Sequence, residues 1–208
     1  MYAELISKSF HEREPILKDE LAKLLPVSNK NTLNQTISYM VSFGLLKRLE
    51  NGIYYIPSEI DKFSQLKPSL KDVINKKYLA NFRGIRSGAY LLYKYKLTSQ
   101  VSEFHEILSM NVSTHSRSKK EYGGKVSISY PKFEINEDNI LYHEFLELLK
   151  NYNLSDYSNE ESIRLLKKIF KLMDLKKDRL LAYSKYYKGN RLAYVRKLVK
   201  EVLNYEVE

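Results

Sequence analysis

Apolar residues recur at helical spacing in the first 45 residues and predict three helices. A first apolar stripe runs from Tyr2 to Phe10, and a second helix is expected over residues 18–25, before Pro26. A third helix is expected after Ser28, its predicted N-cap, because Leu33, Ile37 and Met40 then share one face. The opposite face of this third helix is predicted to carry the polar residues Asn31, Asn34, Gln35, Ser38 and Ser42.

Two short apolar runs follow, residues 46–49 and 53–56, and Asn51-Gly52 separates them. This dipeptide favours a type I′ turn, in which both central residues have positive φ, so we expect a tight β-hairpin. A two-residue loop would place Arg48 opposite Tyr55 and the neighbouring Leu49 opposite Tyr54. Three helices followed by a hairpin is the order of a winged helix-turn-helix.

The rest of the chain alternates between helical and extended patterns. A polar stretch predicts a linker over residues 59–69, and a second domain is expected over residues 70–208. Its predicted helices cover residues 70–79, 87–95, 139–152, 158–173, 178–187 and 191–203, with strands at 107–112 and 125–130 and a mobile basic loop at 113–124. The predicted fold is therefore α+β, with an N-terminal winged helix-turn-helix over residues 1–58 and a C-terminal mixed α/β domain that ends in a helical segment.

Charge changes this picture because it is distributed unevenly. The chain has 35 basic and 25 acidic residues, a net charge of +10, which favours an anionic partner such as nucleic acid. Residues 1–60 hold seven basic and seven acidic residues, whereas residues 61–128 hold thirteen and five. We expect the middle segment to add phosphate or partner contacts. The alternative is that its charged residues are dispersed over the surface and only increase solubility. The candidate cations are Lys76, Lys77, Arg83, Arg86, Lys94, Lys96, Arg117, Lys119 and Lys120.

Several classes of function are disfavoured. The chain has no cysteine, so disulfides, zinc ribbons and thiol nucleophiles are excluded. Its four histidines are scattered, and no glycine-rich phosphate loop is present. Glu134, Glu137 and Asp138 could hold Mg²⁺ in a nuclease, but their spacing is weak evidence. We therefore expect no catalytic residue, metal or cofactor. The lack of a long apolar run and of a secretory signal pattern predicts a cytoplasmic protein without a membrane segment.

The polar face of the third helix is the most informative feature. Amide and hydroxyl side chains can donate to and accept from base edges in a major groove, and Lys30 at the helix start could meet a phosphate. A solvated polar face is the alternative, but the hairpin that follows at once, with Lys47, Arg48 and Tyr55, favours DNA binding.

A family resemblance covers most of the chain. The residues that carry it are Gly44-Leu45-Leu46-Lys47-Arg48-Leu49, Gly52-Ile53-Tyr54-Tyr55-Ile56-Pro57, Ser87-Gly88-Ala89-Tyr90, Leu97-Thr98-Ser99-Gln100-Val101 and Arg191-Leu192-Ala193-Tyr194-Val195. Together they resemble the AbiEi-type antitoxins of type IV toxin-antitoxin systems, which serve in phage defence.

The resemblance implies a transcriptional repressor that binds inverted repeats in its own promoter, as a monomer or dimer on double-stranded DNA. It also implies a C-terminal domain that counteracts a nucleotidyltransferase toxin. The alternative is a stand-alone winged-helix regulator with a C-terminal ligand or oligomerisation domain. The DNA-facing residues that the resemblance implies are Asn29, Lys30, Asn31, Thr32, Gln35 and Ser38 on the helix, with Arg48 and Tyr55 on the wing.

Overall fold

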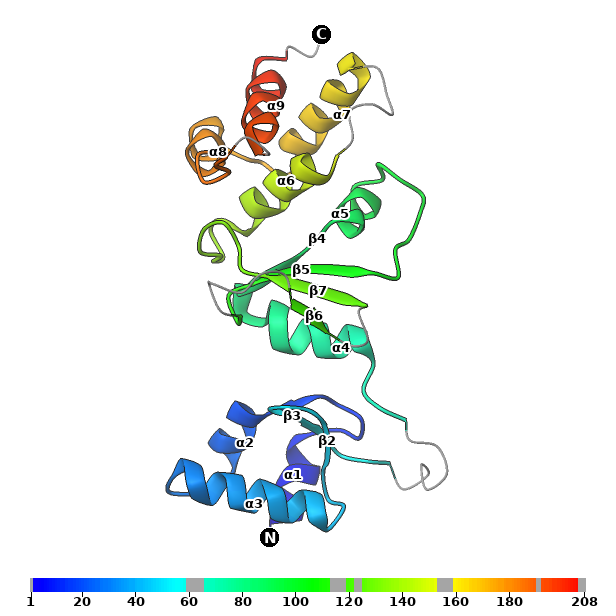
Figure 1. The fold of residues 1–208 in the computed structure, drawn as a ribbon, viewed down its shortest axis with the longest axis vertical. Coiled ribbons are helices and arrows are strands. Elements are labelled where there is room, and N and C mark those ends of the chain that lie inside the picture. The colour runs from blue at the N-terminus through cyan, green and yellow to red at the C-terminus, as the bar shows by residue number, and fades with distance from the viewer. Residues whose placement is uncertain are drawn as a thin grey trace. The chain divides into compact units, whose positions relative to one another are not determined.

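The computed structural model describes residues 2–58, 66–112, 119–121, 125–152, 159–189 and 192–205, without the side chains of residues 119–121 and 159. Contacts divide the chain into two compact units, Met1–Lys77 and Tyr78–Glu208. Both contain helices and a small sheet, so the predicted α+β class is confirmed (Figure 1). Residues 59–65 of the predicted linker lie outside the described residues.

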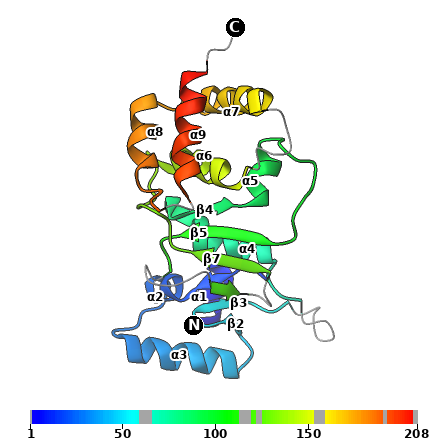
Figure 2. The ribbon, with the colours of Figure 1, turned by 45° about the horizontal axis from the view of Figure 1, so that its top comes forward.

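The first unit has helices and strands in mixed order. It contains α1 (Tyr2–Ser9), β1 (Ile16–Leu17), α2 (Lys18–Leu24), α3 (Lys30–Ser42), β2 (Lys47–Glu50), β3 (Ile53–Tyr55) and α4 (Leu70–Ile74). A π-helical segment, η2 (Asn75–Leu79), follows α4 directly. The strands form an antiparallel sheet in the order β1-β3-β2. Among the described helices of this unit, α3 is the longest (Figures 1 and 2).

The apolar stripes predicted for this unit form its core. Ile6 of α1, Leu21 of α2 and Met40 of α3 are all buried in one cluster with the sheet. The predicted N-cap of α3 was wrong by one residue, because Asn29 caps the helix rather than Ser28. The Asn29 side-chain oxygen accepts from the backbone N–H of Thr32 at 2.9 Å and from its hydroxyl at 3.1 Å, the bond from N-cap to third residue that orients a helix start.

The hairpin forms, but its register differs from the predicted one. Lys47 pairs with Tyr55 and Arg48 with Tyr54, and the register shifts before Glu50 pairs with Ile53. The shift leaves an extra residue in β2, which is a β-bulge. The turn also differs from the predicted one: Gly52 has a φ of +80° whereas Asn51 does not have positive φ, so the type I′ turn does not form.

The second unit pairs a mixed sheet with a helical layer. Its elements are η3 (Ala80–Phe82), β4 (Gly84–Ser87), α5 (Ala89–Lys94), β5 (His105–Ser109), β6 (Lys119–Glu121), β7 (Val126–Ser129), α6 (Ile140–Asn151), α7 (Asn159–Leu172), α8 (Lys177–Ser184) and α9 (Ala193–Asn204). The strand order is β4-β5-β7-β6, and only the β5–β7 pair among these is parallel.

Strand β6 corrects one expectation. Residues 113–124 were predicted to form a basic loop, but residues 119–121 pair with β7 as a strand, with Lys119 opposite Ile128. Arg117 lies outside the described residues, and so do residues 113–118 and 122–124. A strand with two consecutive lysines at a sheet edge is a common protection against pairing with another chain.

Helix α6 is the centre of the second unit. It lies between the sheet and the helices α7, α8 and α9 (Figure 1), and seven of its residues are buried. Most of the unit's large apolar cluster comes from α6 to α9, as their helical spacing predicted. Over the described part of the chain, no helix has the length and apolar character needed to cross a membrane.

Candidate nucleic-acid interface

The outward face of α3 displays the predicted polar side chains. Lys30, Asn31, Gln35 and Ser38 are exposed, as are Asn34 and Ser42. Thr32 is half-buried and gives its backbone N–H and hydroxyl to Asn29, so these two residues shape the start of the helix. The buried Leu33, Ile37 and Met40 hold the opposite face in the core, which orients the amide and hydroxyl groups toward solvent.

Two aromatic residues that sequence reasoning missed share this outward face. Tyr39 is 57% exposed and Phe43 is 65% exposed. They contact each other with ring centroids 4.3 Å apart. The signal was present in the sequence, because Tyr39 and Phe43 continue the spacing of four that links Asn31 to Gln35.

The hairpin contributes one exposed cation and corrects one expected contact. Arg48 is exposed, and its guanidinium lies 5.6 Å from the centroid of the Tyr54 ring, which braces the side chain. Lys47 is half-buried. Tyr55 is only 3% exposed, so its side chain is not part of this surface.

The acidic residues of the first unit are separated from α3 in sequence, and Glu14, Glu20 and Glu50 form ion pairs with Lys76 or Lys77. Residues 21–49 contain no acidic residue but include Lys23, Lys30, Lys47 and Arg48. This segment therefore carries net positive charge although residues 1–60 are neutral overall. Asp19 of α2 nevertheless lines a pocket together with Asn29 and Lys30 at the start of α3.

Lys76 and Lys77 have a different role from the phosphate contacts expected of them. The Lys76 ammonium lies 2.6 Å from a carboxylate oxygen of Glu14 and 3.1 Å from one of Glu20, and Lys77 forms an ion pair with Glu50. Burial would raise the pKa of Glu14, but hydrogen bonds from Lys76 and the backbone of His11 outweigh it, and the pKa is lowered. These lysines neutralise acids of the first unit.

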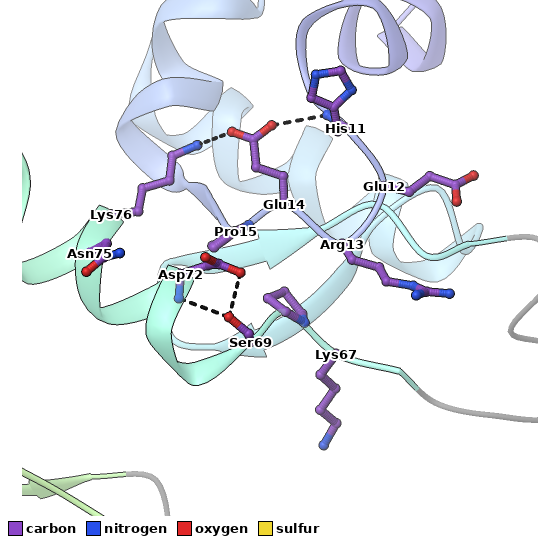
Figure 3. Close-up of a pocket in the computed structure, with 11 residues that line it drawn as sticks. His11, Glu12, Arg13, Glu14, Pro15, Lys67, Ser69, Asp72, Asn75 and Lys76 are labelled. Atoms are coloured by element: carbon purple, nitrogen blue, oxygen red, sulfur yellow. Dashed lines mark hydrogen bonds and ion pairs between the residues drawn. The ribbon is translucent and has the colours of Figure 1, made fainter. Parts of the chain in front are cut away.

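A pocket of about 750 Å³ lies beside these ion pairs (Figure 3). The Glu14–Lys76 pair forms one wall, and on another the Ser69 hydroxyl and the Asp72 carboxylate are 2.5 Å apart. Charges of both signs thus compensate each other inside it. The remaining lining residues are His11, Glu12, Arg13, Pro15, Lys67, Pro68 and Asn75.

The cations of the second unit differ in their exposure and in the groups that they contact. Arg83 and Lys96 are exposed. The Arg86 guanidinium lies 5.2 Å from the centroid of the Tyr90 ring, and Lys94 forms a 2.6 Å ion pair with Glu144. Lys119 and Lys120 belong to β6. Ion pairing and packing therefore engage part of the charge that was expected to meet phosphates.

A buried polar cluster in the second unit surrounds Glu147, whose side chain is fully buried. Its carboxylate accepts hydrogen bonds from the hydroxyls of Ser87 (2.7 Å) and Tyr187 (2.8 Å) and an ion pair from Lys150 (2.7 Å). Burial and this carboxylate together raise the pKa of the Tyr187 hydroxyl. The cluster joins β4, α6 and the chain after α8, and no sequence motif indicated it.

His143 is a second buried polar residue on α6. Its ring stacks on Phe133 with centroids 3.5 Å apart, and its Nδ1 has no hydrogen-bond partner among the described residues. Burial lowers the pKa of His143 to about 4, against opposing effects of the Glu134 carbonyl and the Glu147 charge. The imidazole is therefore neutral in the folded protein at neutral pH.

Comparison with known proteins found no matching family model, no matching curated protein and no matching solved structure. Among the described residues, no group of three or more histidine, aspartate or glutamate side chains is placed to hold a metal ion. The carboxylates considered for Mg²⁺, Glu134, Glu137 and Asp138, are all exposed.

Proposed function

We propose that the first unit is a winged helix-turn-helix that binds double-stranded DNA, with α3 in the major groove and the β2–β3 hairpin beside the backbone. The order of its elements supports this assignment, because two short helices and a third, outward-facing helix precede a hairpin. The observation that carries the proposal is the exposed amide and hydroxyl face of α3 within a segment that has no acidic residue.

The proposed cellular role is that of a non-catalytic antitoxin that represses its own operon. The support for it is the resemblance to AbiEi-type antitoxins of type IV systems described above. In this role the first unit binds the chain's own promoter DNA, and the second unit counteracts a nucleotidyltransferase toxin encoded next to it.

Removing the two exposed cations that flank the reading face is expected to weaken DNA binding at every sequence. Lys30→Ala combined with Arg48→Ala should reduce affinity for promoter DNA about tenfold and lower the salt slope by about two, because two phosphate contacts are lost. Gln35→Ala should instead reduce the preference for the promoter over unrelated DNA, since amides read base edges. Fluorescence anisotropy across a salt series measures both effects.

The matched control is Lys185→Ala with Lys188→Ala, which removes the same charge from exposed positions of the second unit. This control should leave the salt slope unchanged. Equal losses in the control and in the Lys30/Arg48 variant would show that only net charge matters and would contradict a dedicated interface.

Co-expression tests the antitoxin role. The wild-type chain should restore growth to cells that express the neighbouring nucleotidyltransferase gene, whereas an empty vector should not. The Lys30/Arg48 variant should also restore growth under a constitutive promoter, because the proposal assigns neutralisation to the second unit. Failure of the wild-type chain to restore growth would reject the antitoxin role and leave the DNA-binding proposal standing on its own test.

A further inference from the structure

Four exposed side chains, three on α3 and one at its C-cap residue Phe43, form a single row along the helix. Asn31, Gln35, Tyr39 and Phe43 follow one another at intervals of four residues, and such residues are neighbours on one helix face. The two at the start of the row are amides and the two at its end are aromatic. The row extends about 18 Å, at 1.5 Å per residue, which is the length of about five base pairs.

The aromatic end of the row is an ordered surface. The Tyr39 and Phe43 rings contact each other at a centroid distance of 4.3 Å and an angle of 37°, and the Ser42 hydroxyl donates to the Tyr39 carbonyl at 2.8 Å. Each ring limits the rotamers of the other, so little side-chain entropy remains to be lost on binding. More than half of each side chain nevertheless faces solvent.

The charge of the segment that carries this row indicates the class of its binding partner. The row lies in the acid-free segment of residues 21–49, with Lys30 beside its first residue and Lys47 and Arg48 shortly after its last. Because phosphates repel carboxylates and attract cations, a segment that carries four cations and no acid of its own favours a nucleic acid as the partner.

We propose that this row reads A·T base pairs in the major groove. Asn31 and Gln35 are suited to paired hydrogen bonds with adenine N6 and N7, the recognition that amide side chains make. Tyr39 and Phe43 supply apolar contact for the C5-methyl group of thymine, the one apolar group on the major-groove edge. This inference rests on the proposed DNA-binding function and specifies its substrate as A·T-rich duplex.

Three defined 24-base-pair duplexes test the inference by anisotropy at one salt concentration. The first alternates dA and dT, the second replaces every dT with deoxyuridine and so lacks only the methyl groups, and the third alternates dG and dC. The wild-type chain should bind the thymine duplex most tightly. Loss of the methyl groups should weaken binding at least about fourfold, the effect of one buried methyl-sized group.

The protein side of the test is Tyr39→Ala combined with Phe43→Ala. This variant should bind the thymine and deoxyuridine duplexes equally, because the groups that sense the methyl are gone, and its binding to the dG-dC duplex should not change. Tyr93→Ala with Tyr186→Ala is the control, since both residues are exposed in the second unit; it should keep the wild-type discrimination. Both variants are checked for folding by circular dichroism.

Each alternative result has a definite meaning. Equal binding of the wild-type chain to all three duplexes would overturn the A·T inference but leave DNA binding intact. Binding to none of them at low salt would reject the proposed function itself. A Tyr39/Phe43 variant that changes the oligomeric state by light scattering and keeps its discrimination would show that the rings form a protein interface, which also overturns the inference.

Discussion

Replacing Glu147 with alanine is expected to lower the free energy of unfolding of the second unit by about 2–6 kcal/mol, because two buried hydroxyls each lose their acceptor at about 1–3 kcal/mol. The carboxylate has no exposed surface and accepts from Ser87, Tyr187 and Lys150. Its removal leaves the buried hydroxyls of Ser87 and Tyr187 without their acceptor, and it leaves the partly exposed ammonium of Lys150 without its ion-pair partner. Urea unfolding followed by circular dichroism measures the change.

Two further variants separate the buried cluster from general effects of charge. Glu147→Gln keeps the side-chain volume and one acceptor oxygen, so it should cost less than the alanine change. Glu201→Ala removes an exposed carboxylate whose partner, Lys197, lies 3.6 Å away on the same helix, and such pairs contribute about 0.5 kcal/mol or less. A Glu147→Ala loss no larger than that of Glu201→Ala would contradict the role given to the cluster.

Helical periodicity predicted the elements that bury one continuous stripe. In α3 the stripe Leu33, Ile37 and Met40 is buried as expected, and the same reasoning located α6 and α9 to within two residues at each end. These elements could be predicted from the sequence because the spacing of residues along one helix decides which side chains share a face. The exposed face of α3 followed from the same argument.

The hairpin and its residues needed information that local sequence does not contain. Tyr55 was expected on the exposed wing, but its side chain is buried, as are those of the other two residues of β3. Whether a face of a hairpin is covered depends on segments outside the hairpin, and alternation within the hairpin cannot reveal them. The bulge near Leu49 likewise has no signal in the Asn51-Gly52 dipeptide.

The roles of charged residues were the least predictable part. The run of cations after residue 61 suggested one phosphate-binding set, yet Lys76 and Lys94 are ion-paired with Glu14 and Glu144. No feature of the sequence indicated that Glu147 is buried; α6 is enclosed by the sheet and by the later helices. Such pairings join residues up to 62 positions apart, and composition carries no signal for them.

Acidification is expected to destabilise the second unit through His143. The pKa of this imidazole is about 4 in the folded protein because of burial, against about 6.5 in an unfolded chain. The unfolded state therefore takes up the proton first, so the contribution to stability is complete above pH 6.5 and is lost as the pH falls toward 4. Its size is about 3 kcal/mol for a shift of this magnitude.

Replacing His143 with phenylalanine isolates this contribution from other titrating groups. The stacking on Phe133 can be kept, whereas the ring nitrogens are removed. The difference between wild-type and variant unfolding free energies should then be constant above pH 6.5 and shift by about 3 kcal/mol in favour of the variant by pH 4. His105→Phe is the comparison: burial and the Arg86 charge also lower its pKa, but the residue is only partly buried. His105→Phe should therefore give a smaller shift of the unfolding free energy in the same direction. A wild-type-to-variant difference that does not change with pH for His143→Phe would contradict a buried neutral imidazole.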